Sequence, residues 1–143
     1  MFKEQKFKSD GDAIKRLEEK GLIWGYTAIF DEEKIGLTHF MLMVKRTMKK
    51  LDETTIDKIV SRKFEHLASE IGITIESSSY VHCDYDWVIT FTAEDIIQAK
   101  KLSESLIVMH PGVIQKITIS QTLMFIRKQY ILNPESKNLK KFL

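Results

Sequence analysis

The chain has 143 residues, of which 43% are hydrophobic and 29% charged, as expected for one globular domain with a core of its own. Its 22 basic and 20 acidic side chains leave a net charge of +2, which argues against a protein that coats nucleic acid through bulk charge. A single cysteine, Cys83, excludes an internal disulfide, and no apolar run reaches the roughly 18 residues of a membrane span, so we expect a cytoplasmic protein without a membrane partner.

The first predicted elements are a short helix and a strand. Ile14 and Leu17 stand three residues apart among charged residues and are followed by Gly21, which predicts a helix over 12–20. The next segment, 22–30, is rich in aromatic and β-favouring residues and predicts a strand. One side of this strand would carry Trp24, Tyr26, Ala28 and Phe30.

The middle of the chain predicts a strand, a helix and a hairpin. After a turn, the segment 38–46 has apolar residues in both alternating sets, which predicts a strand covered on both faces. Apolar residues at steps of three and four predict one helix over 52–71, ended by Gly72. Two close β-like segments, 75–82 and 85–91, predict a hairpin.

The last third of the chain predicts a second large helix and a long strand. Thr92 and Asp95 resemble a capping box, and the helix that follows should stop before His110 and Pro111. Alternating apolar and polar residues predict a strand over 113–125. The lysine-rich segment 133–143 is expected to be a mobile tail unless it docks on a neighbour.

This order of elements predicts the fold class. Strand, helix, strand, strand, helix, strand from residue 38 onward indicates an α+β, ferredoxin-like (split β-α-β) fold with an antiparallel sheet and both helices on one face. The other sheet face would expose Met41, Met43 and Trp87 or their neighbours, more apolar surface than monomers usually show. We therefore predict a partner subunit and a dimeric α/β sandwich.

Three groups of residues, taken in order, carry a resemblance to a known family. They are the junction Ile14, Leu17, Glu18, Gly21, Ile23, Gly25, Tyr26, Thr27 and Ala28 with Asp31, Lys34, Gly36 and Leu37; the turn Asp84, Tyr85 and Asp86; and Pro111, Gly112, Val113, Thr118 and Lys128. Together they resemble the Lrp/AsnC family of transcriptional regulators, and in particular its effector-binding half, the regulation-of-amino-acid-metabolism (RAM) domain.

The resemblance implies a division of the chain and a form of self-assembly. Residues 1–21 would be a remnant of a DNA-binding helix region, 22–132 the effector-binding and oligomerisation domain, and 133–143 the C-terminal tail. The family's assemblies imply dimers that join into tetramer or octamer rings. Because Asp12 and Ala13 stand where the family has arginines, and only one helix fits before Gly21, direct DNA binding would depend on Lys15 and Arg16 aligned by the ring.

The resemblance also implies an effector site. In the family, small effectors, usually amino acids, bind between dimers near the aspartate-bearing turn. Here the effector-binding residues would be Asp84, Tyr85, Asp86, Thr118 and Ser120. Carboxylates suit the ammonium group of an amino acid and hydroxyls suit its carboxylate. The residues alone leave a second interpretation open, in which Asp84 and Asp86 are turn formers. The family's glycine is replaced by Cys83, so the effector's identity does not carry over.

Other residues allow several further interpretations. Trp24, Tyr26 and Phe30 with Lys15 and Arg16 nearby could stack nucleic-acid bases, but a dimer interface is favoured because two cations anchor a strand poorly. Neighbouring strand residues point to opposite faces, so His82 and Cys83 are read as structural and no metal or cofactor is expected. We expect a regulator or stand-alone effector-binding protein and no enzyme. The alternatives are an oligomerising scaffold without effector and an enzyme similar to siroheme decarboxylases.

Overall fold

The computed structural model describes residues 2–143, with side chains from residue 11 onward. It divides into two compact units, Met1–Phe30 and Asp31–Leu143. The first unit consists of helix α1 (Phe2–Glu19) and an extended segment. The helix predicted over 12–20 is therefore confirmed as the second half of a longer one. Among the residues described, no helix combines the length and apolarity that crossing a bilayer requires.

The strand predicted over 22–30 is wrong for the single chain. The segment is extended but forms no strand, because it pairs with no other strand of the described chain; the Leu22 and Ile23 amides are bonded only to the Leu17 carbonyl of α1. Local side-chain bonds hold it instead: the Trp24 indole donates to the Gly21 carbonyl (2.9 Å), and the Tyr26 hydroxyl donates to Glu18 Oε1 (2.6 Å). The bond to the Glu18 carboxylate raises the pKa of Tyr26.

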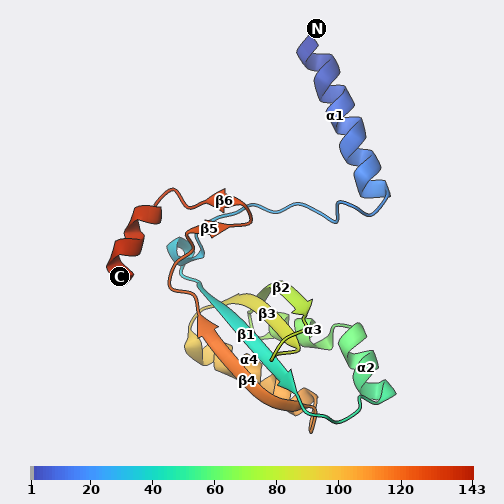
Figure 1. The fold of residues 1–143 in the computed structure, drawn as a ribbon, viewed down its shortest axis with the longest axis vertical. Coiled ribbons are helices and arrows are strands. Elements are labelled where there is room, and N and C mark those ends of the chain that lie inside the picture. Colours follow the sequence, from blue (N-terminus) through green and yellow to red (C-terminus); the bar gives the residue numbers. More distant parts are fainter. Residues whose placement is uncertain (1) are drawn as a thin grey trace. The chain divides into compact units, whose positions relative to one another are not determined.

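The second unit has the predicted ferredoxin-like arrangement. Four strands form one antiparallel sheet in the order β2-β3-β1-β4, and the helices lie on one face of it (Figure 1). Its elements are η1 (Glu32–Ile35), β1 (Thr38–Arg46), α2 (Glu53–Val60), α3 (Lys63–Glu70), β2 (Thr74–Tyr80), β3 (Trp87–Ala93), α4 (Ile96–Met109) and β4 (Ile114–Gln121), followed by β5 (Arg127–Lys128), β6 (Ile131–Leu132) and η2 (Ser136–Phe142).

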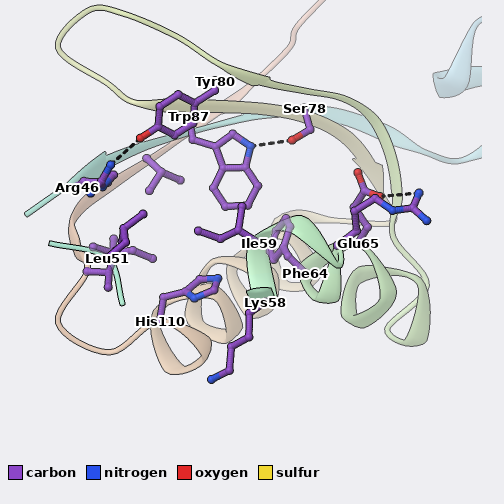
Figure 2. Close-up of a pocket in the computed structure, with 14 residues that line it drawn as sticks. Arg46, Leu51, Lys58, Ile59, Phe64, Glu65, Ser78, Tyr80, Trp87 and His110 are labelled. Atoms are coloured by element: carbon purple, nitrogen blue, oxygen red, sulfur yellow. Dashed lines mark hydrogen bonds and ion pairs between the residues drawn. The ribbon is translucent and has the colours of Figure 1, made fainter. Parts of the chain in front are cut away.

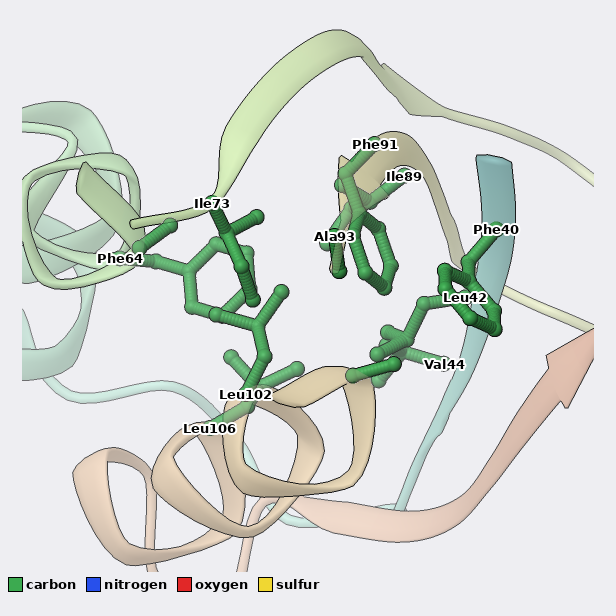
Figure 3. Close-up of a cluster of buried hydrophobic side chains, with 12 residues drawn as sticks. Phe40, Leu42, Val44, Phe64, Ile73, Ile89, Phe91, Ala93, Leu102 and Leu106 are labelled. Atoms are coloured by element: carbon green, nitrogen blue, oxygen red, sulfur yellow. The ribbon is translucent and has the colours of Figure 1, made fainter. Parts of the chain in front are cut away.

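The core lies between the sheet and helices α3 and α4 (Figure 3). At its centre Phe40 of β1 stacks on Phe91 of β3, with ring centroids 5.6 Å apart. Alternation along the strands sends every second side chain toward the helices, which contribute apolar residues at steps of three and four. The fully enclosed residues are Phe40, Leu42, Ile89, Phe91, Ala68, Ala93, Ala99, Leu102 and Leu106.

The single helix predicted over 52–71 is in fact two helices. Arg62, between α2 and α3, adopts a left-handed conformation (φ 58°, ψ 38°), which breaks the helical hydrogen-bond ladder. The break lets α3 turn Phe64 and Ala68 into the core, whereas α2 buries none of its residues. Sequence periodicity runs through the break unchanged, so it could not reveal it.

Three predicted boundaries also shift. Asp95 is itself the N-cap of α4 and accepts a hydrogen bond from the Gln98 amide (2.9 Å), so the capping box predicted from Thr92 is wrong. Strand β4 ends at Gln121, four residues before the predicted end, and the chain continues into the β5-β6 hairpin. The expected mobile tail contains the 3-10 helix η2.

The sheet face opposite the helices, which we call the open face, is more polar than predicted. Trp87 points toward the helices, where its indole donates to Ser78 Oγ (2.7 Å). Met41 and Met43 do lie on the open face but are half-buried. Hydroxyl-bearing residues of the neighbouring strands, such as Thr90 and Thr118, surround them. A uniformly apolar open face therefore does not form.

We predict that Leu102→Ala lowers the free energy of unfolding by about 2 to 5 kcal/mol, because it removes a fully enclosed side chain and leaves a cavity. Chemical denaturation followed by circular dichroism measures this. Ile97→Ala on the same helix is the matched control, since Ile97 is 63% exposed and its loss should cost only about 0.5 kcal/mol. Equal losses in the two variants would contradict the assigned core.

Candidate functional site

A hollow lies where the turn before β3 meets the end of β1. Cys83, Asp84 and Asp86 form one wall, and the other wall is the basic end of β1 with the residues after it: Lys45, Arg46, Thr47 and Met48. Acidic and basic groups thus line one small space. Asp84 is exposed, and among the described residues it has no hydrogen-bond or ion-pair partner. Its carboxylate is available to a ligand.

Asp86 has a structural role in this wall. Its Oδ2 accepts a hydrogen bond from the Arg46 backbone amide (2.7 Å), and its own amide donates to the Val44 carbonyl (2.9 Å). Its carbonyl accepts from the Val81 amide (2.9 Å). Asp86 therefore fixes the turn against β1. The side chain of Cys83 also serves the turn, because its sulfur accepts from the Tyr85 amide (3.4 Å).

The structure brings two further predicted site residues together. The Tyr85 hydroxyl lies 3.1 Å from Thr118 Oγ1, at a partly buried position. Thr118 pairs with Met43 in the sheet, and Ser120 pairs with Met41 two residues further along β4. Ser120 thus shares the open face with Thr118 but stands further from the turn, and none of Tyr85, Thr118 and Ser120 belongs to the lining of the hollow.

The sequence interpretation missed the basic wall of the hollow. Lys45 and Arg46 are adjacent in a strand and carried no recognisable motif. Their relevance comes from strand pairing, which sets Val44 opposite Trp87 and so places the end of β1 beside the turn. The pair of basic residues at the end of a predicted strand was the one available signal.

The other predicted residues lie in the first unit. Lys15 and Arg16 are exposed on α1, and Arg16 Nε donates to the Asp12 carbonyl (3.4 Å). Trp24 is 97% exposed, and Tyr26 and Phe30 are also exposed. In the part of the chain that the structure describes, no three histidine, cysteine, aspartate or glutamate side chains gather to hold a metal ion.

A buried ion cluster lies at the end of the open face away from the hollow. Lys128 Nζ is bonded to Glu32 Oε1 and lies 2.9 Å from Glu76 Oε2, and it sits over the Phe125 ring at 4.8 Å from the centroid. His39 Nε2 lies 3.2 Å from the other Glu76 oxygen. These contacts fasten the segment after β4 to the sheet.

The pKa values in the cluster follow from its ion pairs. Burial alone would raise the pKa of Glu76, but the hydrogen bonds and charges of Lys128 and His39 outweigh it and hold this pKa below its ordinary value. Burial alone would lower the pKa of Lys128, but Glu32 and Glu76 outweigh it and raise this pKa. Both shifts favour the charged forms, as in a cluster whose charges compensate one another.

Comparison with solved structures identifies the fold. The feast or famine regulatory protein from M. tuberculosis complexed with L-methionine is 19% identical, with a TM-score of 0.62 over 85% of this chain and 75% of that chain. A transcriptional regulator from Neisseria meningitidis in complex with L-Met is 17% identical, with a TM-score of 0.55 over 91% and 75%. An AsnC family transcriptional regulator from Agrobacterium tumefaciens is 16% identical, with a TM-score of 0.56 over 91% and 76%.

This likeness establishes the class of fold. The chain has the ferredoxin-like fold of Lrp/AsnC regulators, so the resemblance read from the sequence is confirmed at the level of the fold. Comparison of the sequence with protein-family models and with curated proteins finds no match.

We predict that Glu76→Gln flattens the acid side of the stability profile. The Glu76 pKa lies below 4.5 in the folded chain, so its carboxylate contributes stability that is complete above pH 4.5 and is lost as the pH falls through the folded pKa. The variant should lose about 1 to 3 kcal/mol near neutral pH and less on acidification. Urea denaturation from about pH 3 to 7 tests this.

Glu104→Gln, at an exposed position of α4, is the matched control for this prediction. Its profile should follow that of the unmodified chain throughout. If Glu76→Gln also follows the unmodified profile, the cluster does not contribute to stability.

Proposed function

We propose that the chain is an Lrp/AsnC-type transcriptional regulator or stand-alone effector-binding protein, and that the hollow beside the 83–86 turn binds an amino acid. The single observation behind the proposal is that carboxylates and cations face each other across one small space. The M. tuberculosis and N. meningitidis proteins with this fold were solved with L-methionine.

The geometry suits a zwitterion. The exposed Asp84 carboxylate offers an acceptor for an ammonium group, and Lys45 offers a cation for a carboxylate. Tyr85 and Thr118 add hydroxyl groups on the adjoining open face. A neutral ligand would leave both charged walls without partners, and an anion would be repelled by Asp84.

Binding would act on transcription through assembly. A ligand that contacts two dimers at this edge stabilises the assembly in which they meet, by the difference in its affinity for the two states. The segment 22–30 supports self-association, since it pairs with no other strand among the described residues and its aromatic side chains are exposed. A second copy could supply the missing strand neighbour.

We predict that Asp84→Asn weakens amino-acid binding about tenfold or more, because it removes the charge that faces the ammonium group. Isothermal titration calorimetry against the twenty amino acids, with mass followed by light scattering, provides the measurement. Asp57→Asn on the exposed surface of α2 removes an equal charge outside the hollow and should leave binding unchanged. Absence of heat with every amino acid, together with an unchanged mass, would refute the proposal.

The companion variant Asp86→Ala separates the two interpretations of the turn. Its carboxylate accepts from the Arg46 amide, so loss of the fold would show that Asp86 acts as a turn former. A folded variant with weakened binding would place Asp86 among the ligand contacts.

The exposed aromatic segment also supports a second function, that of an oligomerising scaffold. Here Trp24→Ala combined with Tyr26→Ala should lower the mass of the assembly by removing two anchoring side chains. Light scattering measures this, and Tyr130→Ala, which removes a 92% exposed aromatic in the other unit, is the control. An unmodified chain that stays a single subunit at micromolar concentration would exclude both assembly-based functions.

A further inference from the structure

A second cavity lies on the other side of the sheet, between α2, the start of α3 and the helix-facing side of β1, β3 and β4 (Figure 2). Its volume is about 290 Å³. In Figure 2 the Trp87 indole and the His110 ring approach it from opposite sides, and Ile59 and Phe64 close a third. The size and the apolar lining are those of a site for a small organic molecule.

Two polar atoms in the wall lack partners. Within the described part of the chain, neither Arg46 Nε nor His110 Nδ1 forms a hydrogen bond, although both atoms are buried. His110 is only 5% exposed. The remainder of the Arg46 side chain is held in place, since its NH1 donates to the Tyr80 hydroxyl (2.7 Å). Buried polar groups are normally hydrogen-bonded, so these two atoms mark a part of the wall whose polar groups the chain itself does not satisfy.

Helix α2, which borders the cavity, is packed only loosely against the rest of the chain. The helix is amphipathic, yet none of its residues is buried, and Ile56 and Ile59 are 44% and 41% exposed. An apolar ligand beneath α2 would bury part of the Ile59 side chain, which lines the cavity, and add contacts that the chain alone does not provide.

The cavity wall carries a net positive charge, which favours a ligand with a negative group. Arg46, Lys58 and Arg62 line the cavity, whereas Glu65 is its one acid and pairs with Arg62 at 3.6 Å. A net positive wall of this kind attracts a negative group and offers no free carboxylate to an ammonium.

We propose that this cavity binds a small monocarboxylate with an apolar body, such as a phenyl-substituted or branched-alkyl acid without an amino group. The carboxylate pairs with the Arg46 guanidinium, and the apolar body lies against Trp87 and Ile59. The site is distinct from the amino-acid hollow, which lies at the other side of β1's end and contains Asp84.

The state of His110 agrees with this assignment. Burial, with a smaller contribution from the Lys58 charge, lowers the pKa of His110, so its ring is neutral at neutral pH. A neutral imidazole adds no charge to the wall, so the charge that faces a ligand comes from the other lining residues.

Trp24→Phe provides a reporter protein, because Trp87 is then the one tryptophan and the replaced side chain is 97% exposed. The probes are phenylacetate and 4-methylpentanoate, with the uncharged 4-methylpentanamide and the zwitterion L-leucine as comparisons. We expect both acids to change Trp87 emission in a saturable way, with the amide at least about tenfold weaker. No saturable change with either acid at millimolar concentration, or equal binding of acid and amide, overturns the proposal.

Calorimetry on variants locates the site. Arg46→Met should weaken acid binding about tenfold or more, and Lys63→Met, which removes a nearby exposed cation outside the lining, should not. Ile59→Trp places a larger side chain in the cavity and should abolish binding. Ile59 is 41% exposed, so the substitution should leave the chain folded. Circular dichroism confirms that each variant is folded.

Three further outcomes have definite meanings. Acid binding that survives Ile59→Trp in a folded protein overturns the proposal. A concentration-dependent change in Trp87 emission without any acid identifies a second copy of the chain as the occupant, which also overturns it. Loss of amino-acid binding in Asp84→Asn with acid binding retained shows that the two sites are independent.

Discussion

The position of β1 between β3 and β4 is the constraint on which both sites depend. Its pairing sets Phe40 beside Phe91 and Val44 beside Trp87, and it directs Phe40, Leu42 and Val44 toward α3 and α4. Because side chains alternate, a shift of one residue would exchange the core with the open face. The enclosed Phe40 and Phe91 rings prevent that exchange, since neither could be solvated without losing its packing.

At the end of β1, the open face and the helix-facing side of the sheet are lined by differently charged residues. The pairing with β4 shifts between Lys45 and Arg46, a bulge that also receives the Asp86 carboxylate. Bulges re-aim side chains, and here the two cations serve different spaces. Lys45 lines the hollow with Asp84, whereas the Arg46 guanidinium enters the cavity under α2. The end of β1 therefore contributes to both proposed sites: the hollow, which carries charges of both signs, and the cavity under α2, which carries net positive charge.

Two parts of the chain remain without a full set of partners. Helix α2 buries no residue, and the 22–30 segment has no strand neighbour within the described chain. By contrast, the opposite end of the open face is closed by the Lys128 cluster, where burial of charge is compensated by two carboxylates. The unpartnered regions are accordingly where a ligand and a second copy are proposed to act.

The sequence by itself determined the fold class, the strand β1 with its exact bounds and the approximate places of β2, β3 and α4, because these depend on local periodicity and on Gly and Pro. It also indicated the turn around Asp84. Only the tertiary structure decided the break at Arg62, the basic wall opposite Asp84 and the cavity lined by Trp87 and His110. The break is a single left-handed residue that the apolar periodicity does not reveal. The basic wall and the cavity join residues far apart in the chain, which strand pairing and helix packing bring together.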